Sequence, residues 1–257
     1  MRVVSLTCSN TEIVAALGLG HLLVGVDDHS DHPPDLLEGL PRLGPDLGID
    51  IDAVARCRPD LVLASLTVPG HEAVVAGLEA AGLPTIAPAP VSVADMLDDV
   101  RTIARHLGHA ERGEVLAAEL DAALQPLPPL PRRPRILVEW WPKPVIVPGR
   151  DSWVTQLLEL AGADNPLGDD PCKSRPVTDD EVVAMAPDAA VLCWCGVPFE
   201  RYRPDVVTSR ASWADTPALR EGQVHCIPEA YLGRPGPRLV QGLAALRRVA
   251  EAVVASG

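Results

Sequence analysis

The sequence predicts an α/β protein of two lobes, each built on a mostly parallel sheet. The first observation is a phrase that occurs once in each half, over 52–63 and again over 180–191. In both copies a helical stretch stops before a proline, and an aspartate leads into an apolar strand. A helix followed in this way by a turn and an apolar strand is typical of a parallel α/β sheet. The second observation is the length of 257 residues, which suits two lobes, since domains have roughly 100–200 residues.

A proline-rich segment is the third observation, and it sets the boundaries. Prolines recur through 126–134, which makes this stretch a stiff, extended connector. Before it, the capping pattern at Ser92 opens a helix that meets no proline as far as Gln125 and spans about 45–50 Å. We expect this helix to cross between the lobes. The expected parts are an N-terminal lobe over 1–91, a connecting helix over 92–125, the linker over 126–134 and a C-terminal lobe over 135–257.

Local patterns justify the elements of the first lobe in order. An apolar strand covers 2–6, and the capping pattern from Ser9 to Glu12 opens a helix that Gly18 or Gly20 ends. A strand over 22–26 and a polar loop follow. The first copy of the phrase supplies a helix and the strand at 61–64. A helix over 70–81 and a strand over 85–87 complete the lobe.

The second lobe repeats this plan. A strand over 136–140 precedes a helix over 152–160, which Gly162 closes. Thr178 and Glu181 form a capping box that opens the second copy of the phrase. Its strand should cover 189–194. A further strand over 224–227 and an amphipathic helix over 237–255 complete the lobe.

Composition and charge exclude several classes of protein. The net charge of −13 argues against a nucleic-acid-binding protein, because such proteins present a basic face. No stretch approaches the run of about 18 apolar residues that a membrane-spanning helix needs. The chain lacks the Gly-x-Ser-x-Gly, phosphate-loop and His-Glu-x-x-His motifs of common enzyme classes. We therefore expect a monomeric binding protein that neither spans a membrane nor binds nucleic acid.

The N-terminus and the cysteines indicate a compartment. Met1 leads directly into a strand, without the basic and apolar regions of a signal peptide, so as written the chain is predicted to be cytoplasmic. Cys193 and Cys195 are too close for an easy disulfide, which agrees with a reducing compartment. The alternative is a periplasmic or extracytoplasmic protein from which a leader was removed.

Four segments, in this order, resemble the class III periplasmic binding proteins of ABC importers. They are the start from Val4 to Glu12, the loop from Ser30 to Pro34, the segment Arg58-Pro-Asp-Leu-Val62, and the ending from Arg234 to Arg238. Within that family the resemblance is to receptors for cobalamin and ferric siderophores. It implies two α/β lobes bridged by one long helix, and a ligand captured in the cleft between them. It also implies an ABC permease as partner.

Ligand in α/β sheets binds beyond the carboxyl ends of the strands, so the loops there supply the candidates. The chain has few aromatic residues, and several of them fall on these loops, which favours a flat, largely apolar ligand. We predict a corrinoid such as cobalamin as first choice and an iron chelate as second. The predicted ligand-binding residues are Cys8, Ser9, Asn10, Asp28, His29, His32, Leu66, Thr67, Trp141, Trp194, Cys195, Tyr231 and Arg234.

Thiols and imidazoles on the same loops leave a second hypothesis open. Thiolate and imidazole are the ligands that zinc and soft transition metals prefer. The candidate metal ligands are Cys8, His29, His32, Cys172, Cys193 and Cys195. Free cysteines are also often simply buried. The alternative functions are an intracellular metal or corrinoid carrier that uses these ligands, and a chelatase-like enzyme that inserts metal into a tetrapyrrole.

The resemblance also assigns two glutamates. Cobalamin receptors dock on arginines of the permease through one surface glutamate in each lobe. The nearest positions here are Glu72 and Glu200, each just past a strand. A carboxylate at a helix start is also favoured by the helix dipole alone. We predict both glutamates as permease-docking residues.

Overall fold

The computed structural model describes residues 1–256, which form two compact units. The N-terminal unit comprises Met1–Pro90 and Ala94–Asp121, and the C-terminal unit comprises Val91–Val93 and the chain from Ala122 onward. No helix among the described residues combines the length and apolar character needed to cross a bilayer. The predicted α/β class with mostly parallel sheets is confirmed.

The N-terminal unit alternates strands and helices. Its elements in chain order are β1 (Val3–Ser5), α1 (Cys8–Ala16), η1 (Gly20–Leu22), β2 (Leu23–Val26), α2 (Pro34–Leu37), α3 (Ile51–Arg56), β3 (Leu61–Leu63), α4 (His71–Ala80), β4 (Thr85–Ile86), α5 (Val93–His106) and α6 (Ala110–Ala123).

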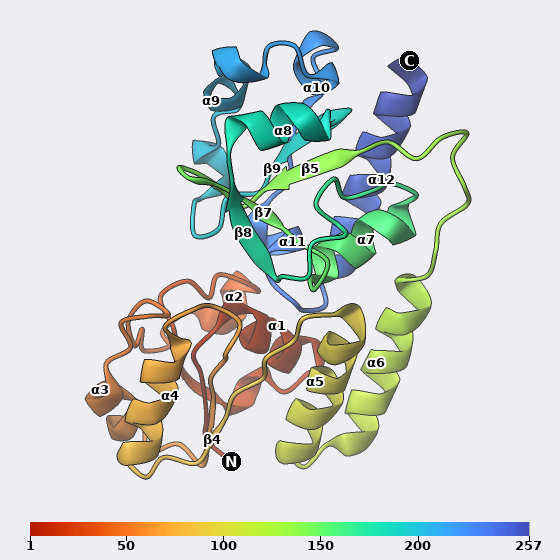
Figure 1. Ribbon diagram of the computed structural model, residues 1–257. Coiled ribbons are helices and arrows are strands. Elements are labelled where there is room, and N and C mark those ends of the chain that lie inside the picture. Colours follow the sequence, from red (N-terminus) through yellow and green to blue (C-terminus); the bar gives the residue numbers. More distant parts are fainter. Residues whose placement is uncertain (257) are drawn as a thin grey trace. The chain divides into compact units, whose positions relative to one another are not determined.

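The four strands of this unit form one parallel sheet in the order β2-β1-β3-β4. Val4 pairs with Val62 in the centre of the sheet, and both are fully buried. Val54 of α3 and Leu78 of α4 pack with Val4 and Val62 on one face of the sheet. Helices α1, α5 and α6 lie on the other side of the strands (Figure 1). Because all strands run the same way, their carboxyl ends share one edge.

The predicted single helix over 92–125 is wrong, because the segment forms a hairpin of two helices, α5 and α6. Gly108 adopts a left-handed conformation with φ 79° and lies in the turn between them. Gly113 of α6 permits the close contact, since a Cβ there would lie 2.5 Å from the Cβ of Ala104. Arg101 adds an ion pair to Glu114 at 3.0 Å. The absence of proline did not predict continuity, because a glycine can end a helix as well.

One carboxylate on α5 lies in an unfavourable environment. Asp99 is half-buried, and burial raises its pKa to about 7, with Asp95 and Asp98 adding to the rise. Neighbouring negative charges and lost hydration both disfavour the ionised form. This side chain therefore carries a pH-dependent cost to stability.

The C-terminal unit begins beyond the α5–α6 hairpin. Its elements are β5 (Ile136–Glu139), β6 (Trp141–Pro142), β7 (Val145–Pro148), α7 (Trp153–Ala161), β8 (Ser174–Val177), α8 (Asp179–Met185), β9 (Ala189–Leu192), η2 (Phe199–Arg201), α9 (Pro204–Thr208), η3 (Ala211–Trp213), α10 (Pro217–Arg220), β10 (Val224–Cys226), α11 (Glu229–Leu232) and α12 (Leu239–Ser256).

Two three-stranded sheets form this unit. The first is parallel in the order β10-β9-β5, and the second is antiparallel in the order β6-β7-β8. The sequence did not predict the antiparallel sheet. A core of buried side chains joins the two, with Leu137 and Leu192 from the parallel sheet and Val147 and Val177 from the antiparallel one. Helices α7 and α12 pack against each other, as Figure 1 also shows.

The repeated phrase has the same structural role in both units. After its helix, α3 or α8, the residue directly before the proline has a positive φ, 48° at Arg58 and 44° at Ala186. Its aspartate then accepts the backbone N–H of the residue that leads into the first strand of the unit. Asp60 accepts from Arg2 at 2.6 Å, and Asp188 accepts from Arg135 at 2.7 Å. The aspartate of each copy therefore holds the strand that follows it, β3 or β9, beside the first strand of the unit, β1 or β5.

Candidate functional site

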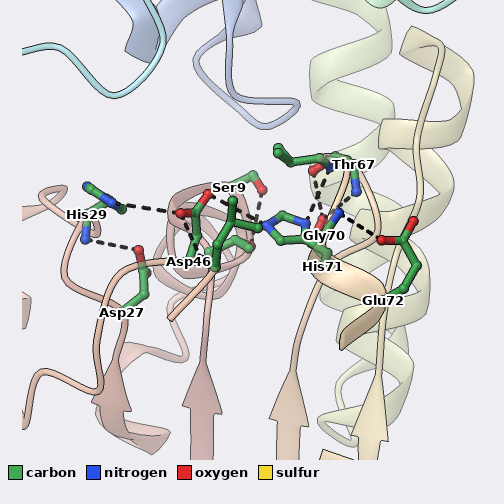
Figure 2. Close-up of polar contacts among 12 residues, drawn as sticks. Ser9, Asp27, His29, Asp46, Thr67, Gly70, His71 and Glu72 are labelled. Carbon is green, nitrogen blue, oxygen red and sulfur yellow. Dashed lines mark hydrogen bonds and ion pairs between the residues drawn. The ribbon is translucent and has the colours of Figure 1, made fainter. Parts of the chain in front are cut away.

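The edge where the parallel strands of the N-terminal unit end gathers the residues predicted from this half. Residues Cys8, Ser9 and Asn10 follow β1, residues Asp28, His29 and His32 follow β2, and Leu66 and Thr67 follow β3. Figure 2 shows Ser9, His29 and Thr67 on this edge, above the ends of the strands. The rule on strand ends thus located one group of side chains in this unit.

Hydrogen bonds within the unit already occupy some of these side chains. Asn10 is buried, and its Nδ2 donates to the carbonyl of Ala64 at 2.7 Å. Asp28 accepts the backbone N–H of Gly44 at 3.2 Å. Asn10 therefore links α1 to the end of β3, which gives it a structural role. The hydroxyls of half-buried Ser9 and Thr67 also have partners, Thr7 Oγ1 at 3.4 Å and Ser65 Oγ at 2.9 Å.

A buried polar network fixes the loop after β2. Asp27 is fully buried, and burial raises its pKa. Its carboxylate accepts the hydroxyl of Ser30 and, at 3.0 Å, the backbone N–H of His29. Thr11 links Ser30 to Ser5 through bonds of 2.8 Å. The network holds the backbone of His29 while its ring stays exposed.

Two histidines from different loops share one carboxylate at this edge. Asp46 has its Oδ1 3.9 Å from Nε2 of His29 and its Oδ2 3.6 Å from Nε2 of His71 (Figure 2). These contacts are longer than full hydrogen bonds. The His71 contact is nevertheless the largest cause that lowers the pKa of Asp46, and the charge of His29 adds to it. His32 is exposed.

In the C-terminal unit, the indole of Trp194 is part of the core. Trp194 is 5% exposed and packs on Tyr202 with ring centroids 5.4 Å apart. Its Nε1 donates to Glu139 Oε1 at 2.9 Å, and Arg210 holds both oxygens of the same buried carboxylate. Trp194 is thus committed to a buried ion pair, which argues against its predicted contact with ligand.

The side chains that follow β5 and β10 are more accessible. Trp141 is 41% exposed and donates its Nε1 to the carbonyl of Lys143 at 3.1 Å. Tyr231 on α11 is half-buried, with the guanidinium of Arg238 6.0 Å from its ring centroid. Arg234 pairs with Glu229 at 2.9 Å. This edge offers aromatic surface together with positive charge.

The thiols are poorly suited to bind metal. Burial raises the pKa of Cys172, raises that of Cys195 to about 12 with Glu229 adding to the rise, and raises that of Cys193 well above its ordinary value. Cys195 is exposed as a residue, but its sulfur lies where the thiolate is poorly hydrated. Thiolates, not thiols, ligate metals. Within residues 1–256, no group of three or more His, Cys, Asp or Glu side chains is placed to hold a metal ion.

Both predicted docking glutamates are exposed near helix starts. Glu72 lies in the first turn of α4, where its Oε2 accepts the N–H of Gly70 at 2.9 Å. Glu200 lies on η2, next to Phe199, which is 47% exposed. The bond from Gly70 gives Glu72 a capping role as well.

Sequence reasoning missed four acidic or imidazole side chains that organise these edges. Asp27 and Glu139 directly follow or end a strand, so the rule on strand ends could have found them. Asp46 lies in a loop between α2 and α3, and His71 begins α4. No local pattern marks these two, because only the folded chain brings them together.

The comparisons with known proteins agree with this architecture. The model of the periplasmic binding protein family matches residues 3–231. A vitamin B12-binding protein of Vibrio cholerae is 26% identical over 246 residues, which cover 94% of this chain and 86% of the relative. An uncharacterized ABC transporter substrate-binding lipoprotein of Bacillus subtilis is also 26% identical, over 254 residues covering 94% of this chain and 77% of the relative.

Solved structures extend the comparison. The periplasmic heme-binding protein RhuT from Roseiflexus sp. RS-1 superposes with a TM-score of 0.84 at 28% identity, covering 98% of both chains. A periplasmic heme-binding protein from Pseudomonas aeruginosa gives a TM-score of 0.78 at 26% identity, covering 97% of this chain and 92% of its own.

Proposed function

The chain belongs to the periplasmic binding protein family, and we propose that it captures a metal tetrapyrrole for an ABC importer, with a corrinoid as first choice and heme, an iron chelate, as second. The candidate contacts are side chains at the carboxyl ends of the parallel strands of each unit. Capture involves no covalent chemistry. The family and the named relatives are binding proteins, so the chain is not assigned an enzymatic activity.

One observation carries the choice of ligand. The vitamin B12-binding relative and the heme-binding structures each cover nearly the whole chain. Corrinoids and heme share a flat, largely apolar macrocycle with a polar rim and a central metal. Exposed Trp141 and half-buried Tyr231 provide aromatic surface for such a ring. Arg234 and the hydroxyls of Ser9 and Thr67 suit its polar rim.

The two alternatives have less support. An intracellular carrier that binds metal through cysteines would need thiolates, and burial keeps Cys193 and Cys195 protonated. The Bacillus subtilis relative is named a lipoprotein and the heme-binding relatives periplasmic, which favours the extracytoplasmic reading over the cytoplasmic one. A chelatase-like enzyme has no counterpart among these relatives.

Delivery to an importer requires a permease as partner. We assign the docking contacts to Glu72 and Glu200, one from each unit, both exposed and both able to meet a cationic surface. The matched control is Glu119, an exposed carboxylate on α6. Glu72→Gln and Glu200→Gln should each weaken stimulation of the permease's ATPase in liposomes, whereas Glu119→Gln should leave it unchanged. Equal stimulation by all three variants would contradict the assignment.

A titration tests the ligand. Isothermal calorimetry and visible absorbance would be recorded with cyanocobalamin, cobinamide, hemin and zinc chloride. We expect saturable binding of a corrinoid or hemin that survives alkylation of the cysteines. Trp141→Ala and Tyr231→Ala should each weaken it about tenfold, the scale of one lost aromatic contact, while exposed Phe199→Ala should not. Binding of zinc alone, lost on alkylation, would overturn the proposal.

A further inference from the structure

The turn that precedes α4 is closed by a histidine. In Val68-Pro69-Gly70-His71, the backbone N–H of His71 donates to the carbonyl of Val68 at 3.2 Å. Gly70 has φ 104° and ψ −17°, close to the third position of a type II turn, and proline suits the second. The sequence thus builds a tight turn that brings His71 back to Val68.

One nitrogen of the His71 ring accepts a hydrogen bond, and the other faces a carboxylate beyond hydrogen-bond distance. The backbone N–H of Val68 donates to Nδ1 at 3.4 Å, so this nitrogen carries a lone pair. The proton of the neutral ring therefore lies on Nε2, which faces Asp46 Oδ2 at 3.6 Å (Figure 2). The ring is only 3% exposed. Water therefore cannot easily replace either contact.

A second proton changes this arrangement. It can bind only at Nδ1, which would then be a donor facing the N–H donor of Val68. We propose that His71 is a proton-sensitive tether of the loop 66–70, which is held when the ring is neutral and released in acid. Imidazoles change charge between about pH 5 and 8.

The charges around the ring come from three segments. Asp46, from the loop between α2 and α3, favours the second proton, and Glu72 on the helix of His71 adds negative charge nearby. His29 lies on the other side of Asp46 and opposes the second proton when it is charged itself. Asp27, behind His29, is buried and hydrogen-bonded within its own network. The nearest partner of the ring is thus an acid, which offsets part of the cost of a buried positive charge.

Release should be local, because the start of the loop has its own anchors. Leu66 donates its N–H to the carbonyl of Pro88 at 2.8 Å, and Thr67 donates its N–H to Ser65 Oγ at 3.2 Å. Only Val68 depends on the ring. Val68 directly follows Leu66 and Thr67, the proposed ligand contacts, so we expect its release to reduce their contact with the ligand in acid, a consequence that rests on the proposed function.

Hydrogen exchange of the Val68 amide, measured by NMR on the full chain, tests the tether. Protection factors would be compared at pH 5 and pH 7.5. We expect about fivefold lower protection at pH 5 in the wild type, the scale of one net hydrogen bond. His71→Asn keeps an acceptor that does not titrate, so its protection should be the same at both pH values. His71→Ala should be unprotected at both, and exposed His106→Asn should match the wild type.

Two results would overturn the tether: equal Val68 protection at both pH values in the wild type, or a wild-type pH difference that persists in His71→Asn. A second arm measures the affinity for cyanocobalamin, which should be several-fold weaker at pH 5 in the wild type and unchanged in His71→Asn. If the wild type binds no cyanocobalamin at either pH, the corrinoid assignment fails, and Val68 exchange still decides the tether. If affinity does not change while Val68 loses protection, the link from loop to ligand is refuted.

Discussion

Replacing Asp99 with asparagine should stabilise the protein at neutral and alkaline pH. The folded chain holds the pKa of this carboxyl at about 7, against an ordinary value of 3.8. Folding therefore favours the proton, so the side chain has its full stability below about pH 4 and loses it as the pH rises through 7. Asparagine has nearly the same shape and no charge to desolvate, so the variant avoids this loss.

The magnitude follows from the two pKa values. A rise from 3.8 to about 7 corresponds to about 4 kcal/mol, at about 1.4 kcal/mol for each tenfold change in proton affinity. Asp99 is half-buried, so water screens part of this energy. We expect a gain of about 2 kcal/mol at pH 8.5 that shrinks towards zero at pH 4.5.

Urea unfolding followed by circular dichroism, at pH values from 4.5 to 8.5, would measure the gain, and tryptophan fluorescence would report on the C-terminal unit, which holds all five tryptophans. Because the chain forms two units, both probes should be fitted separately, and the gain should appear in the transition of the N-terminal unit. Glu119→Gln, an exposed change on the same hairpin, serves as control. A gain independent of pH, or a loss of stability at pH 8.5, would refute the reasoning.

Three further substitutions test packing contacts. Urea unfolding measures the first two, and calorimetry measures the third. Gly113→Ala should cost about 2 kcal/mol, because the new Cβ would lie 2.5 Å from a side chain of α5; an unchanged midpoint would contradict the hairpin. Arg210→Met should cost about 3 kcal/mol by leaving the carboxylate of Glu139 buried and unpaired, and adding Glu139→Gln should recover part of it; no recovery would contradict the ion pair. Gly242→Ala would drive a Cβ into the carbonyl of Tyr231 and should weaken ligand binding more than tenfold in calorimetry; unchanged affinity would count against a role for Tyr231.

The sequence predicted the parallel sheets well because their strands are short apolar runs between turn residues. Both copies of the repeated phrase carry the proline and aspartate that start a strand, and the structure shows why, since Asp60 and Asp188 each fasten the strand that opens their unit. The turn at Gly108 was missed because the segment 92–125 contains no proline, and the prediction relied on proline to mark the end of a helix. The antiparallel sheet was missed because its strands are short and rich in proline.

The candidate site was less predictable for a physical reason. Strand ends located Ser9, His29 and Thr67 correctly at one edge, since the rule depends only on topology. It could not say which side chains the fold itself would use, and so Asn10 and Trp194, both committed to internal hydrogen bonds, were included. Asp46 and His71 come together only through long-range packing, which no local pattern records.

Because the thiols of Cys193 and Cys195 are protonated, they should resist oxidation and disulfide exchange in an oxidising medium. Disulfide exchange and sulfur oxidation proceed through the thiolate. At neutral pH, a pKa of about 12 for Cys195 leaves a thiolate fraction on the order of 10⁻⁵. Cys193 is fully buried, and burial raises its pKa well above its ordinary value. Both thiols should therefore react slowly while the unit is folded, and partial unfolding, which hydrates the sulfurs, would end this protection.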